Sequence, residues 1–308
     1  MRKNIKIAAI QMHSKKGEFE LNRRKAEKYI IQSAERGADL VLLPELFSCG
    51  YVPNKETWNF SECSGGSTEM FLKEMSEKYD ICIGAGLLEK KNGHYFNGYL
   101  VTNSKGEVIC NAIKNNAESY VFKGTNYLNV FETEFGRIGI GVCADNHYTD
   151  FIQRMQRERI NILLMPHALP MPYGESTAIK KSDVEKLRAD VIVFPKLISD
   201  ILGIPVVFIN QIGEFYPMAG IFGKLLNPEV YRIGGYSKIV SESGKVLDEI
   251  ADEEGVIVGE VNLTSTSNEL RKVPNYQGWV QEGSFLLRRI ILPLDVFMGK
   301  IYYMFRRR

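Results

Sequence analysis

Apolar and polar positions along the chain predict short buried strands separated by helices. The apolar runs expected as strands are residues 5–11, 38–45, 81–89, 139–143 and 160–166. Stretches in which apolar residues recur every three or four positions lie between such runs, at 21–36, 68–79 and 149–158. This repeated order of strand, helix and strand is typical of an α/β protein.

Two further segments predict β-hairpins. Residues 98–113 and 237–250 each contain two alternating runs joined by a turn-forming stretch with a glycine. A sheet that contains both hairpins and strand–helix units is mixed. No linker rich in Pro, Gly or Ser interrupts residues 1–275, so we expect one domain there, whereas the character of the sequence changes over 276–308.

Charge and cysteine content narrow the class of protein. The net charge of +2 divides into +5 for residues 284–308 and about −3 for residues 1–283, and a mildly acidic body gives no reason to expect nucleic acid as a partner. The five cysteines include no CxxC pair, which disfavours both a disulfide framework and a structural zinc site. The short apolar run near the N terminus does not fit the core of a signal peptide, so we expect a cytoplasmic protein.

Three reactive side chains occupy equivalent places at the ends of predicted strands. Glu45, Lys114 and Cys143 each follow an apolar run, and ligands gather at the carboxyl ends of strands in such sheets. Glu45 can take the thiol proton, while Lys114 can lower the thiol pKa and stabilise an oxyanion together with the backbone N–H after Cys143. Each residue taken alone is more often a core or surface residue than a catalytic one. Together they predict acyl transfer through a thioester.

A zinc site is an alternative for the same segment. Cys143, Asp145 and His147 would share one face if the strand continued through them. Asp145 and Asn146 favour a turn at this point, and the other histidines fall at no ligand spacing. We therefore expect no metal.

Six sequence blocks occur in a characteristic order. They are IKIAAIQM; GADLVLLPELFSCGY; Lys114 followed by Glu118, Phe122 and Gly124; GRIGIGVCADN; NILLMP; and PVVFINQIG followed by GGYSKIVSESGKVLDE. With these blocks the chain resembles the nitrilase superfamily of carbon–nitrogen hydrolases from residue 4 to about residue 265. The resemblance implies a four-layer αββα sandwich of two mixed sheets. It also implies a catalytic triad of Glu45, Lys114 and Cys143 without a cofactor, and a second pocket glutamate, for which Glu118 is the candidate.

The sequence departs from the family pattern in the expected pocket wall. Members often have an aromatic and a basic residue before the lysine, where this chain reads NAI, and an aromatic after the cysteine, where it has Ala144. These departures leave the triad intact and the substrate open. Several residues in loops near the motif blocks can shape the pocket, although aromatic residues in loops more often serve local packing. They are Tyr51, Trp58, His147, His167 and Tyr173, and Asp145 is a further candidate.

The sequence therefore predicts a hydrolase of a non-peptide C–N bond in an amide, a carbamoyl group or a nitrile. An N-acyltransferase that uses the same thioester and a catalytically idle member that binds a ligand or a protein partner remain as alternatives. The family also implies a homo-oligomer, a dimer or larger, paired through helices near the cysteine. Residues 150–160 and 191–202 are apolar enough to contribute, although the second segment can equally be a core helix.

Residues 276–308 lie outside the resemblance and predict an amphipathic, basic extension. Pro293 is expected to divide it into two short helices, the second with an apolar face of Leu294, Phe297, Met298, Ile301, Met304 and Phe305. Its charges leave no apolar run near the roughly 20 residues that span a bilayer. Two places remain open for this extension. It packs on a neighbouring subunit, or it lies in an anionic membrane interface on the cytoplasmic face, where an amphiphilic substrate would reach Cys143.

Overall fold

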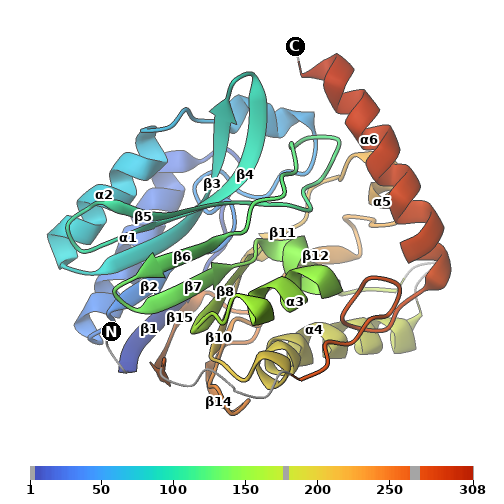
Figure 1. Cartoon of the computed structure of the whole chain (residues 1–308). Coiled ribbons are helices and arrows are strands. Elements are labelled where there is room, and N and C mark those ends of the chain that lie inside the picture. Colours follow the sequence, from blue (N-terminus) through green and yellow to red (C-terminus); the bar gives the residue numbers. More distant parts are fainter. Residues whose placement is uncertain (1–3, 176–179, 264–270, 308) are drawn as a thin grey trace.

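Two six-stranded sheets lie face to face in the computed structural model, which describes residues 4–175, 180–263 and 271–307 (Figure 1). The first sheet has the order β15 (Gly255–Asn262), β1 (Asn4–Gln11), β2 (Leu40–Leu42), β3 (Cys82–Lys91), β4 (His94–Thr102) and β5 (Val108–Ile113). The second has the order β14 (Val246–Glu249), β13 (Lys238–Val240), β10 (Val206–Asn210), β8 (Ile162–His167), β7 (Gly136–Ile140) and β6 (Val130–Thr133). A small third sheet joins β11 (Ile212–Glu214), β12 (Tyr231–Gly234) and β9 (Pro170–Pro172).

Both large sheets are mixed, as the sequence predicts. Strands β1, β2 and β3 run parallel, and so do β7, β8 and β10, because a helix or a long connection joins each strand to the next. The predicted hairpins are present as the antiparallel pairs β4–β5 and β13–β14. The parallel strands place their carboxyl ends together, which is where the candidate catalytic residues follow them.

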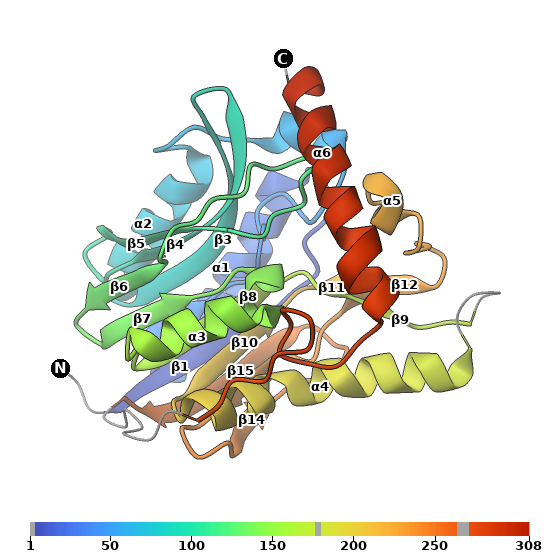
Figure 2. The same ribbon diagram turned by 45° about the vertical axis from the view of Figure 1, so that its right-hand side comes forward.

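Helices cover the outer face of each sheet and complete four layers (Figure 2). They are α1 (Phe19–Glu35) and α2 (Ser67–Tyr79) on the first sheet, and α3 (Thr149–Arg157) and α4 (Lys181–Leu202) on the second. The short helices are η1 (Lys55–Phe60), η2 (Cys143–His147) and α5 (Gly220–Gly223). This arrangement confirms the predicted αββα sandwich.

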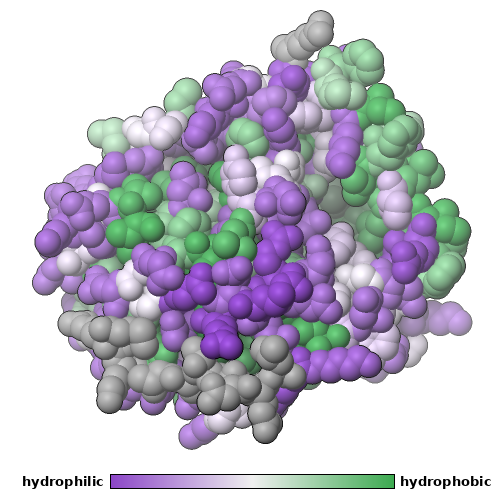
Figure 3. Space-filling view, viewed as in Figure 1, coloured by the Kyte–Doolittle hydropathy of each residue, from purple (hydrophilic) through white to green (hydrophobic). Residues whose placement is uncertain are grey.

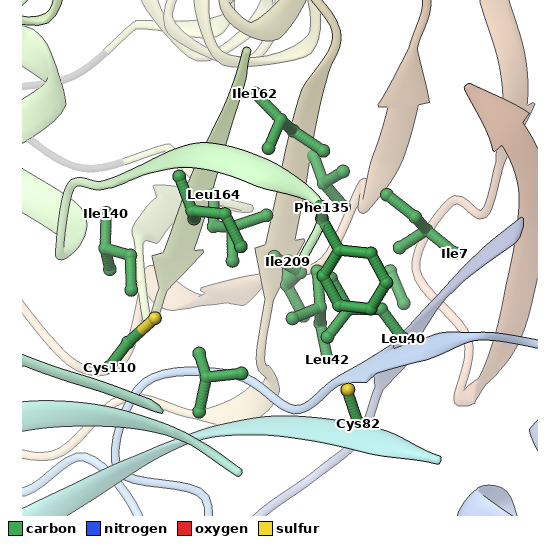
Figure 4. Packing of buried hydrophobic residues seen from close by; sticks show 14 of the residues in the cluster. Ile7, Leu40, Leu42, Cys82, Cys110, Phe135, Ile140, Ile162, Leu164 and Ile209 are labelled. Atoms are coloured by element: carbon green, nitrogen blue, oxygen red, sulfur yellow. The ribbon is translucent and has the colours of Figure 1, made fainter. Parts of the chain in front are cut away.

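The core follows from strands that are apolar on both faces. In β1, Ile5 and Ile7 face the second sheet, whereas Ala8 and Ile10 face the helices α1 and α2. Figure 4 shows the apolar side chains that meet between the two sheets, among them Ile7 and Ile209. The two sheets are thus held together by one dry layer, which fixes the relative position of the loops at its edge.

The helices expected to pair subunits place most of their apolar side chains in their own core. Phe151 and Met155 of α3 and Phe194 and Ile198 of α4 belong to one buried cluster on the second sheet. The core-helix alternative for residues 191–202 therefore describes most of α4, although Val193 is exposed.

Residues 285–306 form one continuous helical segment, so the expected division at Pro293 is wrong. A π-helix, η3 (Leu287–Ile291), leads directly into α6 (Leu292–Arg306). Pro293 lies in the first turn of α6, where its missing N–H is tolerated and its fixed φ suits a helix. No helix in the described part of the chain combines the length and apolar character needed to cross a membrane.

Candidate active site

The three candidate catalytic residues lie in turns after β2, β5 and β7. Cys143 begins the 3-10 helix η2 and has a left-handed φ of 49°, a strained conformation for a residue with a side chain. The amide of Asn146 stabilises this turn by donating to the backbone oxygens of Gly141 and Cys143, at 2.6 and 3.2 Å. The sharp turn separates the thiol from the strand and leaves it at the edge of the inter-sheet core.

Lys114 is the centre of a buried charged cluster. Its side chain is fully buried, and its Nζ lies 2.8 Å from Glu45 Oε1 and 2.7 Å from Glu118 Oε1. Burial disfavours the charged lysine, but the negative charges that Cys143 as a thiolate, Glu118 and Glu45 can carry outweigh it and hold the lysine pKa well above its ordinary value. Lys114 is therefore a permanent cation in this site.

Glu45 is oriented by three neighbours. Asn97 donates to its Oε1 at 2.7 Å, and Gln211 donates to its backbone oxygen. Gly86 permits the close approach of the Glu45 backbone, since a Cβ on this glycine would lie 2.6 Å from Glu45 Cα. The other carboxylate oxygen, Oε2, is buried and has no hydrogen-bond partner among the described residues. This oxygen is therefore the one that is not engaged by Lys114 or Asn97.

Cys143 is a protonated thiol at rest. Burial and the charge of Glu45 raise its pKa well above the ordinary value. Lys114 and a hydrogen bond from the backbone N–H of Ala168 lower the pKa, as expected for Lys114, but the larger contributions prevail. The thiol therefore needs a base at the moment of attack.

Glu118, the candidate for the second pocket glutamate, contacts Lys114 and Tyr51. Besides its ion pair with Lys114, Glu118 Oε1 accepts a hydrogen bond of 2.9 Å from the Tyr51 hydroxyl. Burial and Glu118 hold the pKa of Tyr51 well above its ordinary value, so the phenol stays a donor. Two of the expected pocket residues, Tyr51 and Glu118, thus join the triad in one network.

Asp145 fixes the chain beside Lys114 instead of pointing into a pocket. Its carboxylate accepts from the backbone N–H groups of Asn115 and Asn116 at 3.1 and 2.7 Å, and from the Asn116 side chain at 3.0 Å. Burial raises its pKa to about 6 despite these bonds. Ala144, which follows the cysteine, is partly exposed and presents only a methyl group.

The two expected histidines pack in the layer between the second sheet and α4. His147 stacks on Phe194 with ring centroids 4.3 Å apart, and His167 packs on Phe208 at 4.5 Å. Burial lowers the pKa of His147 to about 4 and that of His167 well below its ordinary value. Their role in substrate binding stays a prediction.

The two remaining aromatic candidates have structural partners. Trp58 donates to the backbone oxygen of Val121 at 2.7 Å and thereby supports the loop that carries Glu118. Tyr173 lines a separate surface cavity of about 370 Å³ with His13, Gly213 and Arg232.

The strand geometry that the zinc alternative needs is absent. The chain turns into η2 at Cys143, so Cys143, Asp145 and His147 do not share a strand face. Asp145 is bonded to backbone amides and His147 is stacked on a phenylalanine, as described above. Within residues 4–175, 180–263 and 271–307, no group of three His, Cys, Asp or Glu side chains has a metal-binding arrangement.

Comparison with known proteins identifies the family. Carbon-nitrogen hydrolases, as a family, match residues 6–268. The chain belongs to this family. A probable nitrilase from Schizosaccharomyces pombe is 26% identical over 93% of this chain and 98% of that protein. A 2-oxoglutaramate amidase from Bacillus subtilis is 23% identical over 87% of this chain and 95% of that protein.

Other family members match less of the chain or only its fold. A citrullinase from Francisella tularensis is 27% identical, but the match spans 54% of this chain and 62% of that enzyme. The structure of a carbon-nitrogen hydrolase from Helicobacter pylori superimposes with a TM-score of 0.73 over 84% of this chain and 90% of that chain, at 20% identity. A mutant amidase from Nesterenkonia, at a TM-score of 0.66 and 19% identity over 83% of this chain and 92% of that chain, carries acrylamide on its active-site cysteine. These likenesses show the fold, and with the family match they identify this chain as a carbon–nitrogen hydrolase.

Sequence reasoning missed Asn97, Gly86 and Gln211, which position Glu45, whereas Asn210 and Gly213 match a family block behind the site. Asn97 lies at a buried position within β4, and nothing in the local sequence distinguishes it from the other buried residues of that strand. Gln211 follows Asn210 in the PVVFINQIG block, and this block was the only available signal for it. Asn210 accepts from the backbone N–H of Leu169 at 2.9 Å and so fixes the chain next to Ala168.

Proposed function

We propose that the protein hydrolyses the C–N bond of a small amide through a thioester on Cys143. The observation that carries the proposal is the buried Lys114, paired with both Glu45 and Glu118 beside a thiol that burial keeps protonated. The cation can stabilise negative charge on a substrate oxygen. The free Oε2 of Glu45 can accept the thiol proton.

The first half of the reaction forms the thioester. Glu45 removes the proton from Cys143 Sγ as the sulfur attacks the carbonyl carbon, and the carbonyl oxygen becomes an oxyanion. Lys114 Nζ and the backbone N–H after Cys143 stabilise that oxyanion. The C–N bond then breaks, and the leaving amine or ammonia takes the proton that Glu45 received.

The second half returns the enzyme to its starting state. Glu45 removes a proton from water as the water oxygen attacks the thioester carbon. The C–S bond breaks, the carboxylic acid leaves, and Cys143 regains its proton from Glu45. One amide and one water thus become one acid and one amine, and the chain needs no redox partner for this reaction.

We place an amide or a carbamoyl group before a nitrile as the substrate class. Glu45 is held where it can alternate between base and acid, and loss of an amine or ammonia requires such a proton donor. The names of the relatives support the same choice, because they include an amidase and a citrullinase besides a nitrilase. A nitrile remains within reach of the same attack on carbon.

The first test removes the nucleophile. Cys143→Ala should lower ammonia release from a panel of short and long-chain amides, ureido acids and nitriles by at least about a thousandfold, with an unchanged circular dichroism spectrum. Cys63→Ala is the matched control, because Cys63 is an exposed thiol outside the site, and it should keep full activity. Retained turnover in the Cys143 variant would contradict the proposal.

Two outcomes of this panel would point to the alternatives. If added hydroxylamine yields hydroxamate at the expense of acid and wild-type hydrolysis is slow, the thioester serves an acyltransferase. If wild-type protein releases no product from any compound but is stabilised thermally by one of them, the protein is a ligand-binding member. Iodoacetamide at neutral pH does not separate these cases, because the thiol pKa is raised at rest.

A further inference from the structure

One face of the segment formed by η3 and α6 packs against the rest of the protein. Asp295 and Tyr303 are buried beneath α6, with exposed fractions of 6% and 5%. The Tyr303 hydroxyl accepts a hydrogen bond of 2.9 Å from the backbone N–H of Tyr95. Gly299 lies so close to Ser119 and Tyr120 that no side chain fits between them. This inner face holds the helix firmly against the body.

The opposite face of the segment is apolar and uncovered. The exposed apolar side chains on it are Phe285, Leu286, Ile290, Leu294, Phe297, Met298, Met304 and Phe305. Phe305, Phe285 and Phe297 are the most exposed of these, with 74%, 63% and 61% of their surface exposed. Ile221 and Leu225, in and just after the neighbouring α5, are exposed as well. Figure 3 shows the apolar surface along the right-hand edge, where Figure 1 places α6.

The exposed charges on this segment are all positive. Asp295, its one acidic residue, accepts from the backbone N–H groups of Ile221 and Phe222 and does not reach the surface. Arg288 and Arg307 bind backbone oxygens of their own chain. Arg289, Lys300 and Arg306 are exposed and form no ion pair within the described residues, and Arg308 lies outside them. The outer face therefore combines bulky apolar side chains with unpaired cations.

We propose that the outer face of residues 285–306 is a docking surface for an anionic lipid bilayer. Phenylalanine, leucine, isoleucine and methionine side chains would enter the acyl boundary, while Arg289, Lys300 and Arg306 lie at the level of acidic headgroups. A second copy of this chain fits less well. A twofold axis through this face would bring two cationic helices together with no exposed acid on either to neutralise them.

The position of the helix also suggests how such docking serves the active site. Its inner face packs on residues 119 and 120, next to Glu118, so the bilayer would lie on the side of the molecule that carries this loop. An amide with an apolar chain could then pass from the lipid to Cys143. This last step rests on the proposed function, whereas the docking itself does not.

Flotation with vesicles tests the docking on the full chain. Wild-type protein should float with vesicles of phosphatidylcholine and phosphatidylglycerol, float less with phosphatidylcholine alone, and be released by high salt. The double variant Phe297→Glu/Phe305→Glu should bind at least tenfold more weakly, and Lys300→Glu/Arg306→Glu should lose the preference for the anionic lipid. Met70→Glu, which places the same charge at an equally exposed site on α2, is the control and should float like wild type.

Several outcomes would overturn the proposal. Wild-type protein that floats with neither vesicle, or a phenylalanine variant that floats as well as wild type, contradicts membrane docking. If sedimentation shows that the phenylalanine variant breaks a larger species into a smaller one without any vesicle binding, a second copy covers this face. Hydrolysis of a short soluble amide without vesicles should be equal in all these variants. Absence of that activity in wild type would contradict the proposed function and leave the flotation result valid.

Discussion

A fully buried lysine keeps its charge in this site because two carboxylates share it. An unpaired ammonium in a protein interior costs several kcal/mol, and the bonds from Lys114 to Glu45 and Glu118 offset that cost. Because these charges lie close to Cys143, they also change the pKa of its thiol. Burial, Glu45 and Glu118 all raise the pKa of the Cys143 thiol, so the loss of one carboxylate changes both the cation and the thiol.

Glu118→Gln separates these effects. The glutamine keeps the size of the side chain but removes a negative charge, so the thiol pKa should fall and iodoacetamide should alkylate Cys143 faster at neutral pH. Lys114 loses an ion pair, and kcat should fall about tenfold or more. Tyr51→Phe keeps the carboxylate and serves as the control, with smaller changes in both rates. Unchanged alkylation and an unchanged kcat would show that Glu118 has only a structural role.

The candidate catalytic residues could be inferred from the sequence, whereas most of the residues that position them could not. Glu45, Lys114 and Cys143 follow strands in recognisable blocks. Asn97 acts through β4, which lies far from Glu45 in the sequence, and Gly86 acts through the absence of a side chain. Only the pairing of β2, β3 and β4 brings these positions together, and no local pattern records that pairing.

At the scale of elements, periodicity located helices α1, α2 and α3 and strands such as β1, β3 and β8, but not β15 or the packed face of the last helix. The predicted apolar face of Leu294, Phe297, Met298, Ile301, Met304 and Phe305 is present, yet most of it points to solvent. The packed face uses a glycine, a buried acid that caps α5, and a tyrosine that bonds to β4. Such a face has no hydrophobic signature in the sequence. Its partners include the backbone N–H groups of Tyr95, Ile221 and Phe222, which only the folded chain brings beside it.

Gly299→Leu tests whether α6 supports the active-site loop. A leucine here would collide with Ser119 and Tyr120 and displace either the helix or the loop that carries Glu118. Unfolding free energy should fall by about 1–3 kcal/mol, and kcat on a soluble amide should fall as well. Val296→Leu, at an exposed position of the same helix, should change neither. A lower unfolding free energy with an unchanged kcat would mean that α6 stabilises the fold but does not support the loop that carries Glu118.

At the scale of the whole molecule, the layers determine which groups stay uncharged. The imidazoles of His147 and His167 lie between the second sheet and α4. Burial, and then the positive charges of Arg288 and Lys114, lower the pKa of His147. His167 faces His147 and Phe208, and its Nδ1 donates to the backbone oxygen of Met165. The folded chain therefore resists taking up protons at this layer.

The consequence is a fold that loses stability in acid. The folded pKa of His147, about 4, lies below its unfolded value of 6.5, so between these pH values the unfolded chain binds a proton that the folded chain does not. The contribution of His147 is complete above pH 6.5 and is lost as the pH falls toward 4, by an amount on the order of 3 kcal/mol. Urea titrations at pH 7, 6 and 5 should therefore show a falling unfolding free energy.

His147→Phe keeps an aromatic ring against Phe194 and should flatten that dependence of unfolding free energy on pH. His94 is partly exposed, so the control His94→Gln should change the dependence less. If the phenylalanine variant keeps the wild-type slope, the acid sensitivity arises from other groups.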